Sequence, residues 1–93
     1  MHIVKLSSRY KKSLRRVSQY PSFVVEELDE IVIKLTQNIP LESRYRDHDL
    51  KGQYQGIREC HIRNDLLLLY QKQDDALILL LVDIGTHASV FGK

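Results

Sequence analysis

The sequence predicts an α+β domain in which two N-terminal helices pack on one face of a mainly antiparallel sheet. Apolar residues recur at helical spacing in the N-terminal half, and three short apolar runs separated by turn residues fill the C-terminal half. The chain has 93 residues, 43% of them hydrophobic, which suffices for one small core but not for two domains with a cleft between them. We therefore expect a single domain over residues 1–93, with any site on an exposed face or in a shallow groove.

The N-terminal half predicts one strand followed by two helices. Residues 2–6 alternate enough for a short strand. Ser8 is a candidate N-cap for the first helix. This helix carries an apolar stripe at positions i, i+4 and i+7, formed by Tyr10, Leu14 and Val17. Pro21 suits the start of a longer amphipathic helix, which should end near Asn38.

The C-terminal half predicts a long connection followed by three strands. Residues 41–55 are polar and are expected to form an exposed loop, and loops of that length are often functional. The apolar runs at 57–62, 66–70 and 76–82 are leucine-rich, but each is short and bounded by turn residues. That length favours buried strands in hairpin order over helices. Residues 83–93 should close the fold as a loop with a last short strand.

Membrane and disulfide-stabilised classes are excluded by the sequence. No apolar run reaches the ~18 residues needed to cross a bilayer, and the N-terminus lacks the basic-then-apolar order of a signal peptide. We therefore expect a cytoplasmic protein with no membrane partner. Cys60 is the only cysteine, which excludes an intrachain disulfide and a multi-cysteine zinc site. Adjacent strand residues point to opposite faces, so Cys60 should be buried and not paired with His61 as a nucleophile.

Positive charge is concentrated at the N-terminus. The net charge is only +2, but residues 1–20 hold six Lys and Arg and no acid. Five of these fall on the first predicted helix: Arg9, Lys11, Lys12, Arg15 and Arg16. Such a segment can attract an RNA backbone or an acidic protein segment, and a solvated helix face is the alternative interpretation.

A group of histidines in the C-terminal half is the strongest chemical signal. His48 lies in the long loop, His61 near the end of a strand and His87 in the closing segment, while Asp65 follows in the turn after His61. Histidine titrates near neutrality, with an unperturbed pKa of about 6.5, so three of them with a carboxylate suggest acid/base catalysis. These histidines show no His-x-x-x-His pair and no cysteine companion, so we expect no metal and no cofactor.

Several motifs in one order resemble the YafQ branch of the RelE/ParE toxin superfamily. They are D-H-x-L-x-G at 47–52, R-E-x-H-I at 58–62 and G-T-H-x-x-x-F at 85–91, with Asp65 between the last two. The resemblance spans nearly the whole chain and implies a RelE-like βααβββ fold. It also implies a type II toxin neutralised by an antitoxin encoded beside it, in a hetero-oligomeric complex. The implied activity is metal-free cleavage of mRNA on the ribosome.

The resemblance further implies roles for individual residues. His87 would act as general acid, His61 and Asp65 as the base end of the site, and His48 with Arg58 would stabilise the phosphate. Further contacts to RNA or phosphate would come from Lys51, Arg63 and Phe91. Phe91 would stack on a base, with a core position as the alternative. The basic helix would dock on rRNA or on the antitoxin.

Two residues depart from the family pattern. Asp83 stands just before the G-T-H segment, where members often carry a basic residue, and Leu66 stands after Asp65, where many carry Trp. Asp83 should place a negative charge near the site, where the family has a candidate phosphate-stabilising cation, a role that Arg58, Arg63 or Lys51 could fill. These departures support an alternative function, a non-catalytic protein-binding module that inhibits gyrase or only retains its antitoxin. A free RNA-binding protein is a third hypothesis and rests on the basic segment alone.

Overall fold

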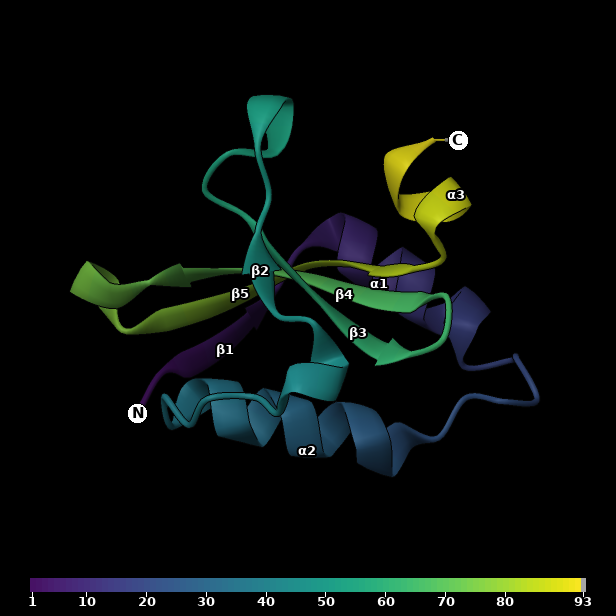
Figure 1. The fold of residues 1–93 in the computed structure, drawn as a ribbon, viewed down its shortest axis with the longest axis horizontal. Helices are drawn as coiled ribbons and strands as arrows, with labels where there is room; N and C mark the ends of the chain where they lie inside the picture. The colour runs from purple at the N-terminus through teal and green to yellow at the C-terminus, as the bar shows by residue number, and fades with distance from the viewer. Residues whose placement is uncertain (93) are drawn as a thin grey trace.

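The computed structural model describes residues 1–92 and contains one five-stranded sheet (Figure 1). The strand order is β1-β5-β4-β3-β2; β1 is parallel to β5 and the other pairs are antiparallel. The strands are β1 (Ile3–Leu6), β2 (His48–Asp49), β3 (Arg58–Arg63), β4 (Leu66–Gln73) and β5 (Ile78–Gly85). The helices are α1 (Ser8–Val17), α2 (Val25–Thr36) and α3 (His87–Phe91), and short 3-10 turns are η1 (Ser43–Tyr45), η2 (Gly52–Tyr54) and η3 (Asp74–Ala76). The predicted α+β class is confirmed.

Helix α1 is capped by Ser7, one residue before the Ser8 that the sequence suggested. Ser7 Oγ accepts a hydrogen bond from the backbone N–H of Tyr10 at 2.9 Å and donates one to the carbonyl of Val82 at 2.7 Å. The same hydroxyl therefore caps α1 and ties it to β5. The predicted apolar stripe is confirmed, since Tyr10 and Val17 are buried.

The second helix starts later than Pro21 suggested. Residues 20–22 form a turn, and α2 begins at Val25 with Val24 at the N-cap. Its end agrees with the prediction, because the helix stops at Thr36 and Asn38 adopts a left-handed backbone with φ of 56°. The helix buries one face, through Leu28, Ile31 and Leu35.

The C-terminal segment differs from the prediction, because it forms a helix where a loop with a last strand was expected. Thr86 Oγ1 accepts from the backbone N–H of Ser89 at 3.1 Å, and Ser89 Oγ accepts from the N–H of Thr86 at 2.9 Å. This reciprocal capping box starts α3 directly after β5. The leucine-rich runs are confirmed as strands β4 and β5, and the long connection carries η1, β2 and η2.

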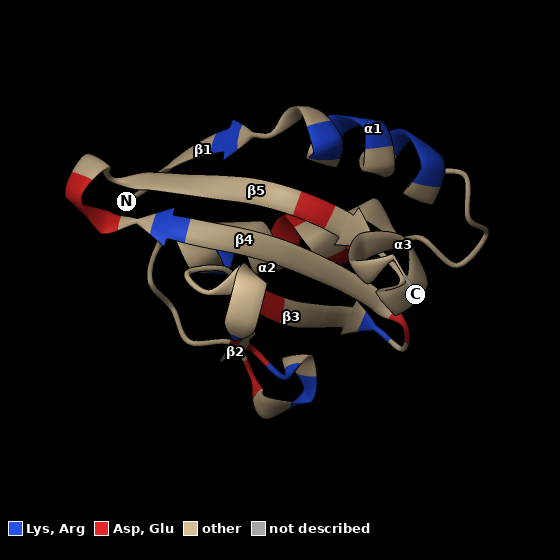
Figure 2. Ribbon diagram, turned by 90° about the horizontal axis from the view of Figure 1, so that it is seen from above, with Lys and Arg blue, Asp and Glu red and all other residues tan. Residues whose placement is uncertain are grey.

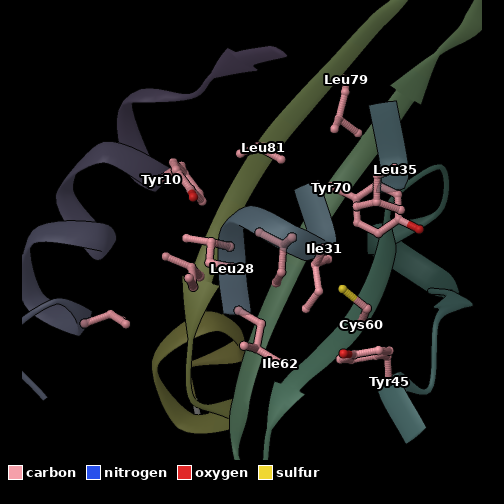
Figure 3. Close-up of a cluster of buried hydrophobic side chains, with 13 residues drawn as sticks. Tyr10, Leu28, Ile31, Leu35, Tyr45, Cys60, Ile62, Tyr70, Leu79 and Leu81 are labelled. Carbon is pink, nitrogen blue, oxygen red and sulfur yellow. The ribbon is translucent and has the colours of Figure 1, made fainter. Parts of the chain in front are cut away.

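The two faces of the sheet carry separate apolar clusters. The larger cluster packs α1 and α2 against one face (Figure 3) and includes Cys60 and Ile62 of β3. The smaller cluster lies on the opposite face, where Val90 of α3 covers Leu67 and Leu69 of β4. Figure 1 shows α2 and α3 on opposite sides of the sheet. Side chains that alternate with Cys60 and Ile62 therefore point toward α3.

Over residues 1–92, none of the helices has the length and apolar character required to cross a membrane.

Candidate active site

Strand β3 places two polar side chains on the α3 side of the sheet. Glu59 and His61 alternate with the core residues Cys60 and Ile62, so both point away from α2. Glu59 is buried, with a side chain only 5% exposed, whereas His61 is partly accessible. The face of β3 that is not covered by α2 therefore carries a buried carboxylate beside an accessible imidazole.

Asp65 and His87 form a hydrogen-bonded pair next to His61. His87 Nδ1 lies 2.6 Å from Asp65 Oδ1, and the backbone N–H of His87 donates to the same oxygen at 3.2 Å. The hydrogen bond from the His87 side chain lowers the pKa of Asp65 below its usual value, and the backbone N–H adds to this effect. Because an ionised carboxylate only accepts, the proton lies on His87 Nδ1 and leaves Nε2 free. The rings of His61 and His87 are 5.8 Å apart.

Glu59 joins two histidines, and it was not among the residues selected from the sequence. Its Oε2 lies 3.2 Å from Nε2 of His48 on β2 and 3.5 Å from Nε2 of His61. The register sets this contact, because His48 and Glu59 are direct partners across the β2–β3 pair. The spacing Glu-x-His on a strand was the available signal, since residues two apart share a face. His48 and His61 both contact Glu59, Asp65 contacts His87, and the rings of His61 and His87 are 5.8 Å apart, so the four predicted catalytic residues lie in one cluster.

A groove borders this set at the end of β3. Its lining includes the predicted residues His61, Asp65 and His87. Three arginines also line it: Arg44 and Arg46 of the η1 segment, and Arg63. Arg63 is held by bidentate hydrogen bonds to Glu27 of α2 at 2.9–3.2 Å. The hydrogen bonds that Arg63 donates to Glu27 raise the pKa of Arg63, and the negative charge of Glu27 adds to this effect. Arg44 and Arg46 carry no signal in the sequence, because only the fold of the long loop brings them here.

Arg58 does not join the histidines, in contrast to its expected role with His48. It alternates with Glu59 on β3, so its side chain lies on the other face of the strand. There Nε and Nη1 donate to Asp47 at 3.4 Å and Asp49 at 2.8 Å, and Nε also reaches the Tyr70 hydroxyl at 3.2 Å. Burial lowers the pKa of Arg58, but the hydrogen bonds to Tyr70 and Asp47 outweigh it and leave that pKa raised. These contacts tie Arg58 to Asp47 and Asp49 at the start of the β2–β3 pair.

Lys51 and Phe91, two further predicted RNA contacts, lie apart from the groove. Lys51 is exposed in the loop between β2 and η2 and borders a separate depression. Phe91 packs partly on the smaller apolar cluster and meets Tyr54 of η2 edge to face, with ring centroids 5.1 Å apart. Its ring is also 6.1 Å from that of His87. Phe91 is therefore half-buried in the smaller cluster and lies beside His87.

The basic residues of α1 form an exposed surface on the outer side of the molecule (Figure 2). Lys11, Lys12, Arg15 and Arg16 make no ion pair within residues 1–92. Arg9 differs from them, since its Nε lies 2.7 Å from Asp83 Oδ2 and its Nη2 donates to the carbonyl of Val90 at 3.0 Å. The predicted docking surface therefore consists of four free cations, and Arg9 belongs to the fold.

The negative charge of Asp83 does not face the histidine site, in contrast to the expectation from the sequence. Asp83 is buried with its carboxylate turned toward α1, where it accepts from Ser13 Oγ at 2.6 Å and from its neighbour's backbone N–H, besides pairing with Arg9. Its charge is therefore compensated locally. Leu66 packs against the larger apolar cluster. The burial predicted for Cys60 is confirmed.

One group of residues can hold a metal ion, although the sequence suggested none. The ligand atoms offered by Glu59, His61 and His87 all lie within 4.8 Å of one another. Two imidazole nitrogens and one carboxylate oxygen are ligands that zinc and copper accept.

These observations define the class of protein. It is a small α+β domain of RelE-like fold that carries a histidine and carboxylate site at one end of its sheet. Residues 2–92 match the family described as the bacterial toxin of type II toxin-antitoxin systems, YafQ. The chain belongs to this YafQ family.

Individual relatives agree with this assignment. The mRNA interferase toxin YafQ of Escherichia coli strain K12 is 31% identical over 90 residues, which covers 96% of this chain and 95% of the relative. The crystal structure of a metal-bound toxin from Helicobacter pylori superposes with a TM-score of 0.91 at 35% identity, covering 98% of this chain and all of that one. YafQ in the E. coli DinJ-YafQ complex superposes with a TM-score of 0.86 at 27% identity, covering 99% and 100% of the two chains.

Proposed function

We propose that the protein is a ribosome-dependent endoribonuclease that cleaves mRNA by metal-free acid/base catalysis through the 2′-hydroxyl. The observation that carries this proposal is the Asp65–His87 pair beside His61 and Glu59, at the edge of a groove lined with arginines. The name mRNA interferase, borne by the E. coli relative, supports the same reaction class.

The acid in this mechanism is His87. Its Nδ1–H is held by Asp65 at 2.6 Å, which fixes the ring and leaves Nε2 to carry the proton that is transferred. Protonation of the departing 5′-oxygen by Nε2 accompanies cleavage of its bond to phosphorus. Asp65 is therefore a positioning residue for His87, and this replaces its expected place at the base end.

The base end of the site comprises His61 and Glu59. A base must remove the proton from the 2′-hydroxyl so that its oxygen attacks phosphorus, which yields a 2′,3′-cyclic phosphate and a free 5′-hydroxyl. His61 is partly exposed and adjacent to His87, so it can contact the reacting hydroxyl. Glu59 stabilises the positive charge that His61 acquires, and His48 on β2 contacts the same carboxylate oxygen. Because the rings of His61 and His87 are 5.8 Å apart, the base and the acid can act on the same phosphate.

The arginines of the groove supply positive charge that stabilises the phosphorane, the five-coordinate phosphorus species formed when the 2′-oxygen attacks. Arg44 and Arg46 are exposed on η1 and its C-cap, and they line the same groove as His61 and His87. Both can contact RNA phosphates that enter along the groove. We assign to them the phosphate-stabilising role that was expected for Arg58, because Arg58 donates to Asp47 and Asp49 on the other face of β3.

A second macromolecule completes this shallow site. The ribosome would hold and orient the mRNA, which a domain with an extent of 35 Å in its longest direction does not do alone. The four free cations of α1 offer a backbone-directed docking surface for rRNA. The antitoxin expected for a type II system would bind the free toxin in a hetero-oligomer, as DinJ binds YafQ in the E. coli complex.

The direct test measures mRNA cleavage by the purified protein with and without ribosomes, with 5′ ends mapped by primer extension. We expect cleavage only with ribosomes, and a loss of about 10²–10⁴-fold in kcat for His87→Gln. The matched control is Asp75→Asn, an exposed residue of η3 at the far end of the sheet (Figure 1), which should cleave like wild type. Full cleavage by His87→Gln would contradict the mechanism. Intact mRNA together with inhibition of gyrase would favour the non-catalytic alternative.

A further inference from the structure

We propose that Arg9 is a positioning residue for His87, because it holds the far end of α3, the short helix whose first residue is His87. The hold on α3 is argued from contacts in this structure. Its effect on cleavage rests on the proposed function. Arg9 would thus have a role that the four free cations of α1 do not share.

Helix α3 is too short to hold its own position. It covers five residues, His87–Phe91. Isolated helices shorter than about 12–15 residues are marginal in water, since the first turn fixes several backbone dihedrals for a single hydrogen bond. Contacts from outside the helix must therefore fix α3, and with it the ring of His87.

The start and one side of α3 are held by its capping box, by Asp65 and by the sheet. The capping box of Thr86 and Ser89 closes the first turn, and Asp65 accepts from the backbone N–H of His87 at 3.2 Å. The side chain of Val90 is buried in the smaller apolar cluster. These contacts do not reach the carbonyls of the last turn, which are without intrahelical partners at the end of any helix. The end of α3 therefore needs a donor from elsewhere in the chain.

Arg9 supplies a donor at that end. Its Nη2 donates to the carbonyl of Val90 at 3.0 Å, across 81 positions of sequence. A positive side chain is favourable there, because unpaired carbonyls give the C-terminus of a helix a partial negative charge. The contact connects opposite faces of the sheet, since α1 packs on one face and α3 on the other.

The free edge of β5 makes this contact possible. Strand β1 pairs with β5 as far as Leu81, so within residues 1–92 the last residues of β5 form an edge on that side. In Figure 2, α1 and α3 both lie along this end of β5. The side chain of Arg9 can therefore pass the edge of β5 and meet the end of α3.

Asp83 fixes the guanidinium of Arg9. Arg9 Nε lies 2.7 Å from Asp83 Oδ2, and the Asp83 side chain is only 3% exposed. The other oxygen, Oδ1, accepts from Ser13 Oγ at 2.6 Å and from the N–H of Ile84 at 2.9 Å, which restrains the carboxylate. Because a guanidinium is planar and rigid, the contact of Nε with Asp83 also directs Nη2 at the carbonyl of Val90. The pair thus sets the distance between β5 and the end of α3.

The position of α3 decides the geometry of the proposed acid. His87 and Val90 are three residues apart, so they are neighbours on the surface of one helix. The ring of His87 is otherwise held by Asp65, whose side chain is 61% exposed. A tilt of α3 would change the 5.8 Å separation between the rings of His87 and His61. Displacements of about 1 Å can slow catalysis by about 10²-fold, so loss of Arg9 should lower kcat.

Hydrogen exchange followed by NMR tests the hold on α3 independently of activity. In Arg9→Gln, the amide of Val90, which donates to the carbonyl of Thr86, should exchange about tenfold faster than in wild type. The amide of Leu68, in the central strand β4, should exchange at the wild-type rate. The matched control is Arg16→Gln, the same substitution at a free cation of α1, which should leave both amides unchanged.

Two results would overturn the hold on α3. One is an unchanged exchange rate at Val90 in a folded Arg9→Gln variant. The other is equal acceleration at Val90 and Leu68, which would show a general loss of stability. Arg9→Lys keeps the charge without the planar fork, so its exchange rate at Val90 should lie between those of wild type and Arg9→Gln. Wild-type exchange in Arg9→Lys would contradict the role of the fork.

Steady-state kinetics of ribosome-dependent cleavage test the effect on His87. Arg9→Gln should lower kcat by about tenfold with KM nearly unchanged. Arg16→Gln removes a docking cation, so it should raise KM and leave kcat unchanged. A rise in KM alone for Arg9→Gln would place Arg9 among the docking cations and overturn its positioning role. If wild type does not cleave mRNA while Arg9→Gln still accelerates exchange at Val90, the proposed nuclease function fails and the kinetic role falls with it, whereas the hold on α3 stands.

Discussion

Arg9 Nε lies 2.7 Å from the buried Oδ2 of Asp83, and this ion pair joins α1 to β5. The same guanidinium donates from Nη2 to the carbonyl of Val90 in α3. Ser13 Oγ supplies a further hydrogen bond to Asp83 at 2.6 Å. Arg9 thus joins the basic helix α1 both to Asp83 on β5 and to α3, the short helix that begins with His87.

This connection predicts a large stability loss for Asp83→Ala. The change leaves the buried Ser13 hydroxyl and the N–H of Ile84 without their acceptor. We expect the free energy of unfolding to fall by about 2–4 kcal/mol, measured by urea denaturation. Asp75→Ala, on an exposed turn, should change it by less than about 0.5 kcal/mol. Equal effects of the two variants would show that the buried contacts contribute nothing.

The Asp65–His87 pair predicts a loss of kcat with KM nearly unchanged for Asp65→Asn. The asparagine retains the size of the side chain but removes the charge that holds Nδ1–H of His87. Because Asp65 acts through His87, ribosome-dependent cleavage should slow by about tenfold or more while mRNA binding is retained. Steady-state kinetics separate the two parameters. A rise in KM alone would instead place Asp65 in direct contact with the RNA.

The groove predicts that Arg46 contacts the RNA backbone. Arg46→Ala should weaken binding to the mRNA-loaded ribosome, and the slope of log affinity against log salt should become shallower by about 1. Lys5→Ala removes the same charge from β1, at the opposite edge of the sheet, and should leave both quantities unchanged. Filter binding at several salt concentrations measures the slope. An equal effect of the two variants would indicate non-specific electrostatic attraction.

Burial predicts that Cys60 is unreactive in the native protein. Its side chain has no exposed surface, and burial raises the pKa of the thiol well above its usual value, with the charges of Asp47 and Glu59 adding to this effect. The thiolate is the reactive form, so alkylation by iodoacetamide should become detectable only when urea unfolds the chain. Mass spectrometry follows the modification. Rapid labelling without denaturant would show that β3 opens locally.

The sequence alone predicted most of the secondary structure, because local signals govern it. The helical spacing of Tyr10 and Val17 and the length of the leucine-rich runs were sufficient for α1, β4 and β5. The predictions missed the exact start of α1, the later start of α2 at Val25 and the helix α3 in the C-terminal segment. Ser7 caps α1 by bonding to both Tyr10 and Val82, and α3 depends on the reciprocal bonds of Thr86 and Ser89.

The candidate site shows what the sequence determined and what only the tertiary structure decided. Residue types and motif order were enough to select His48, His61, Asp65 and His87. Tertiary structure decided the partners: the β2–β3 register placed Glu59 between two histidines, and the alternation of β3 sent Arg58 to the other face. Packing also turned the carboxylate of Asp83 toward α1. The reason is physical, since chemical identity belongs to each residue, whereas distances between residues far apart in the chain arise only when strands pair and a core forms.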